Sequence, residues 1–385
     1  MRITTALFPT VLLASLAFLS GCERNETNAP SATAPVEPVE ISASDRLSDL
    51  SATMTGIAFW SHPNVAFNSL VIVASQDGIA SYNIEDGSEV SRIPAVNAQG
   101  AAVSYLGLGA QARGLLAFLD IDASVFKINA IDNASRSFQA VDGEIPFRGA
   151  LRGFCFGRAA GGQNPVLYAL QKGEMTHYAI EVEGDALTAS AGIAQSVPED
   201  AQSCTVDGID GSVLITRSNG EIHRMTDDGP GELVVSTDIT EIGDVAILLI
   251  ENTEPDPQSV SGLIVALNRE TGGLHVFNRE DGQAIGVMTV MAEDADSEYG
   301  EFIAVNAGDV MGAASANLGG LYRNGVLALG VGNAEAEQPA VIHLIPMNAL
   351  KNTLDLPESE PVNPRGREAE PEEDGLLIDI DFQRD

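Results

Sequence analysis

Acidic side chains in one connecting segment are the most concentrated reactive groups of the sequence. The segment Met291–Glu301 contains five carboxylates: Glu293, Asp294, Asp296, Glu298 and Glu301. Carboxylate oxygens are ligands that Ca²⁺ prefers, so this loop could wrap around a calcium ion. It lacks the glycine turn and the ligand spacing of a defined calcium loop, which makes a solvated acidic loop the simpler interpretation.

Basic side chains are the second group that could do chemistry. Four arginines fall near expected β-strands: Arg113, Arg152, Arg217 and Arg269. Together they could bind an anion without a metal, because a guanidinium group donates paired hydrogen bonds to an oxyanion. The alternative is that each arginine pairs with one of the many acidic residues on the surface.

No catalytic sequence motif accompanies these groups. The sequence contains no nucleophile-elbow, zinc-protease, paired-cysteine, P-loop or EF-hand pattern in a suitable context. Its five histidines are scattered: His62, His177, His223, His275 and His343. A histidine on one face of a strand is more often structural than a metal ligand.

The balance of charges excludes one class of partner. The chain has 20 Lys and Arg residues against 55 Asp and Glu residues, which gives a formal net charge of −35. Such a surface repels DNA and RNA, so we expect no nucleic-acid partner. We expect a monomer whose contact with a membrane is made through a lipid anchor alone.

The first residues predict export and lipidation. Arg2 precedes the apolar segment Ala6–Phe18, which is too short for a stable membrane span. The following Leu19-Ser20-Gly21-Cys22 resembles the bacterial lipobox, so residues 1–21 are interpreted as a signal peptide and Cys22 as the lipidated first residue. Glu23 in place of Asp favours the outer membrane, on its periplasmic or cell-surface face. An ordinary signal peptide with an incidental cysteine is the alternative.

Two segments are expected to lie outside the folded body. Residues 22–46 are rich in Pro, Ala, Glu, Thr and Ser and predict a disordered tether. Residues 352–385 form an acidic tail rich in Pro and Glu, which is expected to be disordered. The apolar and acidic residues that alternate over Leu376–Phe382 could add as a strand to another surface.

Six short apolar runs organise the remaining sequence. They begin at positions 70, 115, 166, 213, 263 and 326, so successive runs start 45 to 63 residues apart. Each run has the length of a buried strand and is too short for a helix. A strand of small residues precedes each run, and an alternating strand follows it.

This long period predicts an all-β protein, a six-bladed β-propeller over residues 47–351 in which each blade is a four-stranded antiparallel sheet. The small residues of the leading strands suit the crowded axis where blades converge. A β-sandwich lacks such a period, and a βαβ fold would need amphipathic helices that the sequence does not contain. Cys155 and Cys204 occupy corresponding positions of neighbouring units; they could form a disulfide or remain two buried thiols.

The leading strands and runs resemble those of the β-propeller phytases. The matching stretches span about residues 47–350: Ala58–Pro63, Gly78–Tyr82, Arg152–Cys155, Gln202–Asp207, Gly308–Val310, Ser315–Gly319 and Ile342–Pro346. The resemblance implies a six-bladed, calcium-dependent 3-phytase, a hydrolase that removes phosphate from myo-inositol hexakisphosphate. In that family, carboxylates on the leading strands hold Ca²⁺ ions that bind phosphate and activate water.

Most positions that would supply those carboxylates are changed here. Thr55-Gly56, Ala101–Ser104 and Thr216-Arg217 stand at the family's acidic or amide positions, and Gln76 replaces a loop lysine. The resemblance leaves four weak metal candidates: Asp309, Asn306, Gln202 and Asp244. Asp244 is expected on the face of its strand opposite to the ligand position. Three residues are phosphate-binding candidates: Lys172, Arg152 and Arg217.

Two hypotheses follow. In the first, the chain is a phytase-family phosphoric monoester hydrolase whose calcium-dependent activity is weakened or lost. In the second, it is a pseudoenzyme, a non-catalytic propeller that binds a phosphorylated small molecule or a protein partner at the bacterial cell envelope.

Overall fold

The six apolar runs become the second strands of six separate antiparallel sheets in the computed structural model, which confirms the predicted six-bladed β-propeller. The structure describes residues 37–366 except 51–52, 160–161, 193, 227–228, 238, 240, 253–259, 294–300, 333–338 and 358. The predicted signal peptide, Cys22 and the end of the acidic tail lie outside the described residues. No helix among the described residues is long and apolar enough to cross a membrane.

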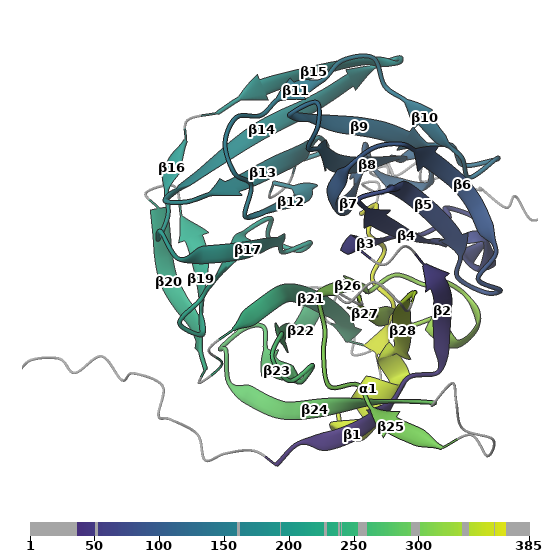
Figure 1. Cartoon of the computed structure of the whole chain (residues 1–385), viewed down its shortest axis with the longest axis vertical. Coiled ribbons are helices and arrows are strands. Elements are labelled where there is room, and N and C mark those ends of the chain that lie inside the picture. Colours follow the sequence, from purple (N-terminus) through teal and green to yellow (C-terminus); the bar gives the residue numbers. More distant parts are fainter. Residues whose placement is uncertain are drawn as a thin grey trace, which may run out of the picture. The chain divides into compact units, whose positions relative to one another are not determined.

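The first five blades are built from strands that follow one another in the chain, the sixth also takes in β2 from the N-terminal side, and in every blade the first strand lies innermost (Figure 1). The first three blades are β3 (Met54–Trp60), β4 (Leu70–Ser75), β5 (Gly78–Asn83) and β6 (Glu89–Pro94); β7 (Ala98–Leu106), β8 (Arg113–Asp120), β9 (Val125–Ile131) and β10 (Phe138–Ala140); and β12 (Gly153–Arg158), β13 (Pro165–Gln171), β14 (Glu174–Glu183) and β15 (Ala186–Ala191). Short strands β11 (Ile145–Pro146) and β16 (Gln195–Ser196) pair with β9 and β14.

The last three blades follow the same order. They are β17 (Ala201–Val206), β18 (Val213–Arg217), β19 (Glu221–Thr226) and β20 (Gly229–Ser236); β21 (Ile242–Asn252), β22 (Val260–Asn268), β23 (Leu274–Asn278) and β24 (Ala284–Glu293); and β26 (Val310–Ala314), β27 (Val326–Val331), β28 (Ala340–Pro346) and β2 (Asp45–Leu50). Strand β25 (Phe302–Ala304) pairs with β24. Short 3-10 turns η1 (Ala66–Asn68), η2 (Gly109–Gln111) and η3 (Gly320–Tyr322) lie between first and second strands.

The ring closes in two ways. Each first strand contacts the first strand of the next blade, and β26 contacts β3, so the six innermost strands surround a central channel. The sixth blade also combines both ends of the propeller, because β2 from the N-terminal side pairs with β28 from the C-terminal side. Because β2 leads directly into β3 of the first blade, its hydrogen bonds to β28 hold the first and last blades together.

The core consists of six apolar clusters, one between each pair of neighbouring blades. The second strands supply most of their fully buried side chains; Leu70, Leu115 and Leu327 are 0% exposed. Burial of one such side chain stabilises the fold by about 1.5–3 kcal/mol. The continuous apolar runs in the sequence therefore reflect strands that are covered on both faces.

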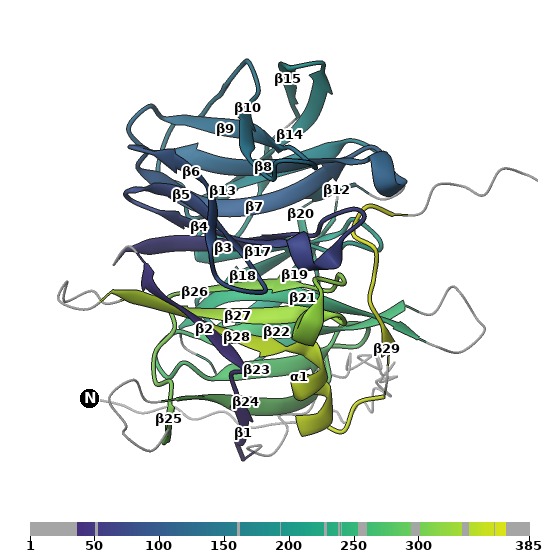
Figure 2. The ribbon, with the colours of Figure 1, turned by 90° about the vertical axis from the view of Figure 1, so that its right-hand side faces the viewer.

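The structure places ordered elements inside both segments that were expected to lie outside the propeller. In the predicted tether, β1 (Val39–Ser42) pairs in parallel with β24, and β2 completes the sixth blade. The reason is burial, since Ile41 is 1% exposed and packs into the cluster between the last two blades. In the predicted tail, β29 (Ser359–Glu360) follows the helix α1 (Met347–Thr353) along one side of the blades (Figure 2).

Candidate functional site

The channel opens into a cavity of about 860 Å³ at the end where the first strands begin. We call this end the first mouth. Residues from all six first strands line it, together with residues of the connections between second and third strands, such as Gln76 and Arg269. The site therefore draws side chains from every blade.

Glycine lets the strands converge at this mouth. A Cβ atom on Gly56 would lie 2.5 Å from the amide nitrogen of Ala101 in the next blade. A Cβ atom on Gly312 would lie 2.8 Å from the carbonyl oxygen of Ile57. Both separations are too short for a real side chain, which explains the small residues of the leading strands.

Irregular strand pairing changes the face on which side chains lie at the first mouth. Four first strands, β3, β7, β17 and β21, show a register shift against their neighbour near the mouth. In β21 the shift lies between Ile242 and Val245, and Asp244 sits inside it. A bulge breaks the alternation of faces along a strand. Asp244 consequently lines the cavity, and the expectation that it lies on the opposite face was wrong.

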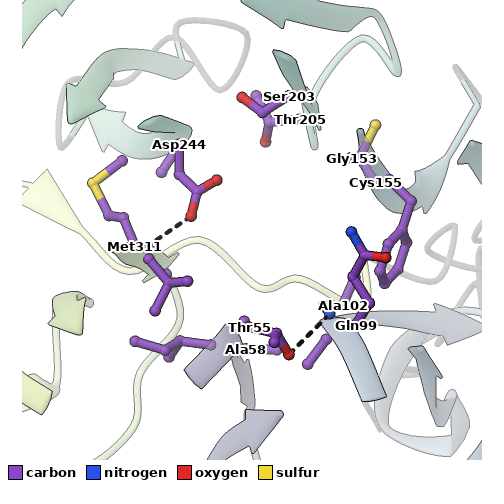
Figure 3. Close-up of a pocket in the computed structure, with 18 of the residues that line it drawn as sticks. Thr55, Ala58, Gln99, Ala102, Gly153, Cys155, Ser203, Thr205, Asp244 and Met311 are labelled. Atoms are coloured by element: carbon purple, nitrogen blue, oxygen red, sulfur yellow. Dashed lines mark hydrogen bonds between the residues drawn. The ribbon is translucent and has the colours of Figure 1, made fainter. Parts of the chain in front are cut away.

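The carboxylate of Asp244 accepts a hydrogen bond of 2.9 Å from the amide nitrogen of Met311 in the neighbouring blade (Figure 3). Burial raises the pKa of this carboxyl group, while the Met311 amide and the positive charge of Arg269 act in the opposite direction. Burial opposes ionisation because it removes the charged form from water. The Asp244 side chain therefore bonds to the neighbouring blade and also faces the channel.

Uncharged polar groups form the opposite wall. The hydroxyl of Thr55 donates to the carbonyl oxygen of Ala98 at 2.8 Å and accepts from the amide of Gly100 at 3.3 Å. Gln99 donates to the carbonyl oxygen of Leu151 at 3.4 Å. Figure 3 shows Thr55 and Gln99 beside each other, with Ser203 and Thr205 across the channel. The hydroxyl of Ser203 also bonds to that of Thr216 at 2.9 Å, so these groups offer a polar ligand chiefly their remaining lone pairs and the free amide atoms of Gln99.

The metal candidates do not gather at one point. Asp309 lines the cavity, but its carboxylate accepts a 2.6 Å hydrogen bond from the amide of Gly332. Asn306 and Gln202 are absent from the cavity wall. Within the described ranges, no group of three or more His, Cys, Asp or Glu side chains could hold a metal ion.

The basic candidates separate into two sets. Arg152 and Arg269 line the cavity with exposed side chains, and neither forms an ion pair with a described residue. Arg113, Arg217 and Lys172 lie outside it and pair with acids: Arg113 with Asp185 at 3.2 Å, Arg217 with Asp200 at 3.0 Å, and Lys172 with Glu199 at 3.1 Å. The prediction that four arginines form a single anion-binding site is therefore wrong. For Arg113 and Arg217 the alternative, pairing with acidic residues at the surface, is correct.

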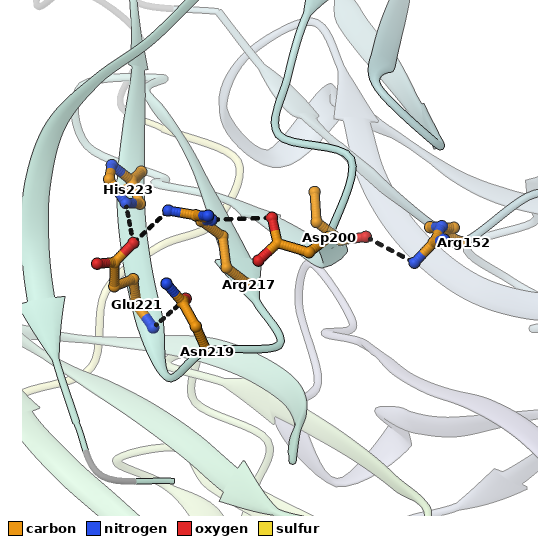
Figure 4. A network of polar contacts seen from close by, with 7 residues as sticks. Arg152, Asp200, Arg217, Asn219, Glu221 and His223 are labelled. Carbon is orange, nitrogen blue, oxygen red and sulfur yellow. Dashed lines mark hydrogen bonds and ion pairs between the residues drawn. The ribbon is translucent and has the colours of Figure 1, made fainter. Parts of the chain in front are cut away.

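Beside Arg152, which donates to the carbonyl oxygen of Ala201 at 3.5 Å, Arg217 belongs to a network of polar contacts (Figure 4). Its guanidinium group also contacts Glu221, whose carboxylate lies 3.0 Å from Nε2 of His223. The hydrogen bond with His223 is the main reason why the pKa of Glu221 lies below its ordinary value. Since these charges satisfy one another, the network offers no free phosphate-binding group.

A disulfide joins Cys155 of β12 to Cys204 of β17 in the wall of the same cavity. Their Cα atoms are 5.6 Å apart. The bond links the first strands of the third and fourth blades across 49 positions of sequence. Neither sulfur is therefore available as a nucleophile, and histidine is absent from the described residues of the wall.

Comparisons with known proteins add little to this geometry. No protein-family model matches the chain, and no curated protein matches it. One similar solved structure is described as KlHsv2 with loop 6CD replaced by a Gly-Ser linker. The match has 12% sequence identity and a TM-score of 0.36, and it covers 76% of this chain and 98% of that chain. It supports no argument about function, and the resemblance to β-propeller phytases stays a prediction.

Proposed function

We propose that this chain is a non-catalytic binding propeller whose first mouth takes a small ligand with an anionic group, such as a phosphate ester. The main observation is the contrast among its basic residues. Arg113, Arg217 and Lys172 each form an ion pair, whereas Arg152 and Arg269 line one cavity and form no ion pair with a described residue. The charge of Arg269 acts on Asp244 in the same wall without a direct contact.

Two guanidinium groups line the same cavity, so both are accessible to an anion that enters it. Each can donate two parallel hydrogen bonds to an oxyanion, and such charge-assisted bonds are stronger than neutral ones. Thr55, Gln99 and Ser203 then supply uncharged partners for the rest of the ligand. The net charge of −35 repels anions at long range, so specificity depends on these short contacts.

The calcium chemistry of the phytases does not fit the residues present at this mouth. A Ca²⁺ ion takes about 6–8 oxygen ligands, usually with several carboxylates. The described wall contains two carboxylates: Asp244 bonds to Met311, and Asp309 bonds to Gly332. We therefore assign no hydrolytic step to the cavity.

The predicted lipid at Cys22 would hold this binding site at the outer membrane of a bacterium. The mass of the mature N-terminal peptide tests this part of the proposal. An acylated Cys22 supports it, and an N-terminus cut elsewhere without lipid contradicts it.

Calorimetric titration with inorganic phosphate and with phytate tests the proposed function. Replacing Arg152 and Arg269 together by Gln should weaken binding by at least about tenfold, because each lost charged hydrogen bond costs about 1.5–3 kcal/mol. The control, Arg113→Gln, removes a partly buried arginine outside the cavity and should leave affinity unchanged.

Phosphate release from phytate is measured in the same samples, with and without Ca²⁺. Binding without turnover agrees with the proposal. Calcium-dependent release that a chelator abolishes would establish the hydrolase instead. Absence of any binding to the native chain would reject the anion site.

A further inference from the structure

The opposite end of the channel, which we call the second mouth, is occupied by the chain itself. The first strands end there around a cavity of about 460 Å³. Part of its wall is made by Val362, Asn363, Pro364 and Gly366, which follow β29. We call Ser359–Gly366 the strap. Figure 2 shows it as the yellow segment along one side of the blades.

The strap is bound through its backbone, as an added peptide would be. Ser359 and Glu360 pair antiparallel with Asn252 and Glu251 at the edge of β21. Further along, the amide of Val362 donates to the carbonyl oxygen of Ser315 at 2.9 Å. Addition of an extended segment to a sheet edge is a common way for proteins to bind peptides.

A turn ends the strap and gives it sequence specificity. The amide of Gly366 donates to the carbonyl oxygen of Asn363 at 3.1 Å, with Pro364 and Arg365 at the two central positions. Asn, Pro and Gly are the residues favoured at the first, second and fourth positions of such turns. Gly366 has a φ of +71°, and a Cβ atom there would lie 3.1 Å from Leu108.

The turn directs Arg365 into a buried slot between the first two blades. The side chain donates to the hydroxyl of Ser61 at 2.8 Å and also contacts the carbonyl oxygen of Ser61. Its guanidinium carbon lies 4.4 Å from the ring centre of Tyr105 and 5.9 Å from that of Trp60. A planar guanidinium group suits aromatic faces and carbonyl oxygens better than a lysine does.

Arg158 holds the strap from the other side. Its guanidinium group donates to the carbonyl oxygens of Pro364 at 2.7 Å and Arg365 at 3.0 Å. These acceptors are backbone atoms, so Arg158 recognises the path of the chain and not its side chains. The slot for Arg365 then supplies the selectivity.

The strap is anchored at an energetic cost. Arg365 is 3% exposed, forms no ion pair with a described acid, and leaves its Nε atom without a hydrogen-bond partner. Burial lowers the pKa of this guanidinium group, which shows the penalty paid by the charged form. A buried cation held by neutral partners makes this contact easier to exchange than an equally buried ion pair.

We propose that the second mouth is a binding groove for an extended peptide bearing an arginine followed by glycine, kept filled by the strap until such a segment of a partner protein replaces it. The groove combines a sheet edge, a clamp for carbonyl oxygens and a guanidinium slot. It lies at the other end of the channel from the first mouth, although the two cavities share wall residues such as Phe59 and Val206, and it is independent of the function proposed there.

A fluorescent peptide with the sequence of residues 357–368 tests the groove on the full-length chain. Arg365→Ala in the protein empties the slot, so this variant should bind the peptide at least about tenfold more tightly than the native chain, whose groove is filled. Replacing Arg365 by Ala in the peptide should weaken binding by about tenfold or more, since charged hydrogen bonds are lost. Replacing Arg367 by Ala in the peptide removes the same charge two positions later and should change little.

Second substitutions in the Arg365→Ala protein test whether the two mouths bind independently. Adding Arg158→Gln to the Arg365→Ala protein should abolish peptide binding, whereas adding Arg152→Gln should preserve it. A folded Arg365→Ala protein that does not bind the peptide, or that binds the alanine peptide equally well, overturns the proposal. If that variant does not fold, excess peptide is added to the native chain. Faster hydrogen exchange of the Val362 amide then supports displacement, and unchanged exchange overturns it.

Discussion

The two mouths of one channel differ in what fills them, although the same six strands reach both. At the first mouth, bulges and glycines open a polar cavity whose two rim arginines form no ion pair with a described residue. At the second mouth, the chain's own strap buries an arginine against the rings of Tyr105 and Trp60. The difference lies in the strand ends and connections, because the blades themselves are common to both mouths.

The disulfide is the largest single stabilising contact that distinguishes the wall of the first mouth. Reducing Cys155–Cys204 should lower the free energy of unfolding by about 4 kcal/mol in the chain-entropy account, because the bond closes a long loop. Chemical denaturation of oxidised and reduced native chain measures this. The Cys155→Ala/Cys204→Ala variant is the control and should no longer respond to the reductant. An unchanged midpoint on reduction of the native chain would show that the bond adds nothing to the wall.

Loss of the buried guanidinium should have the next largest effect, at the other mouth. Arg365→Ala removes hydrogen bonds from a charged group and should lower stability by about 1.5–3 kcal/mol. Arg365→Lys keeps the charge but not the planar group, so it should recover less than half of the loss. Thermal unfolding measures both variants. Equal stability of the lysine variant and the native chain would mean that the slot recognises charge alone.

The rim arginines should affect binding without affecting stability. Arg152 and Arg269 are exposed, and replacing both by Gln should change the free energy of unfolding by less than about 0.5 kcal/mol. Peptide binding at the second mouth of the Arg365→Ala protein should also be unchanged. Fluorescence anisotropy with the strap peptide checks this, and a parallel loss at both mouths would break the distinction between them.

The smallest expected effect concerns the pH dependence of Asp244. Its folded pKa is raised by burial, so the unfolded chain releases this proton first and stability falls as pH rises above about 4. Asp244→Asn keeps an acceptor for the amide of Met311 and removes the charge. Melting temperatures should then be higher than native at pH 7 and similar to native below about pH 4. A lower melting temperature of the Asn variant at pH 7 would show that the carboxylate is needed in its charged form.

The sequence predicts the blades well because fully buried strands appear as uninterrupted apolar runs. Runs such as Leu70–Ser75 and Val326–Val331 needed only their length and spacing to be assigned. The strand β1 was missed because only Ile41 of its four residues is buried, and one apolar residue among polar ones gives no period. The formation of such an edge strand depends on the surface against which it packs, and not on a periodic pattern in its own sequence.

The site was less predictable, for reasons of local geometry. The sequence placed Arg152, Arg217 and Arg269 near strands, but it did not indicate which of them share a cavity. Asp244 was assigned to the wrong face because a bulge leaves no mark in the apolar pattern. The strap was missed altogether, since its contacts depend on turn chemistry and one buried arginine in a segment rich in Pro and Glu. The succession Asn363-Pro364-Arg365-Gly366 was the available signal.

Hydrogen exchange of native and Arg365→Ala chains, followed by mass spectrometry, tests the separation of the two mouths most directly. Exchange reports local opening of each segment without global unfolding. We expect faster exchange in the strap and in the neighbouring segments Ser61–Asn68 and Gly107–Ala112, with no change in Gly100–Ala102 or Ser203–Thr205, which line the first mouth alone. Equal acceleration at both ends, or none in the strap, would contradict this separation.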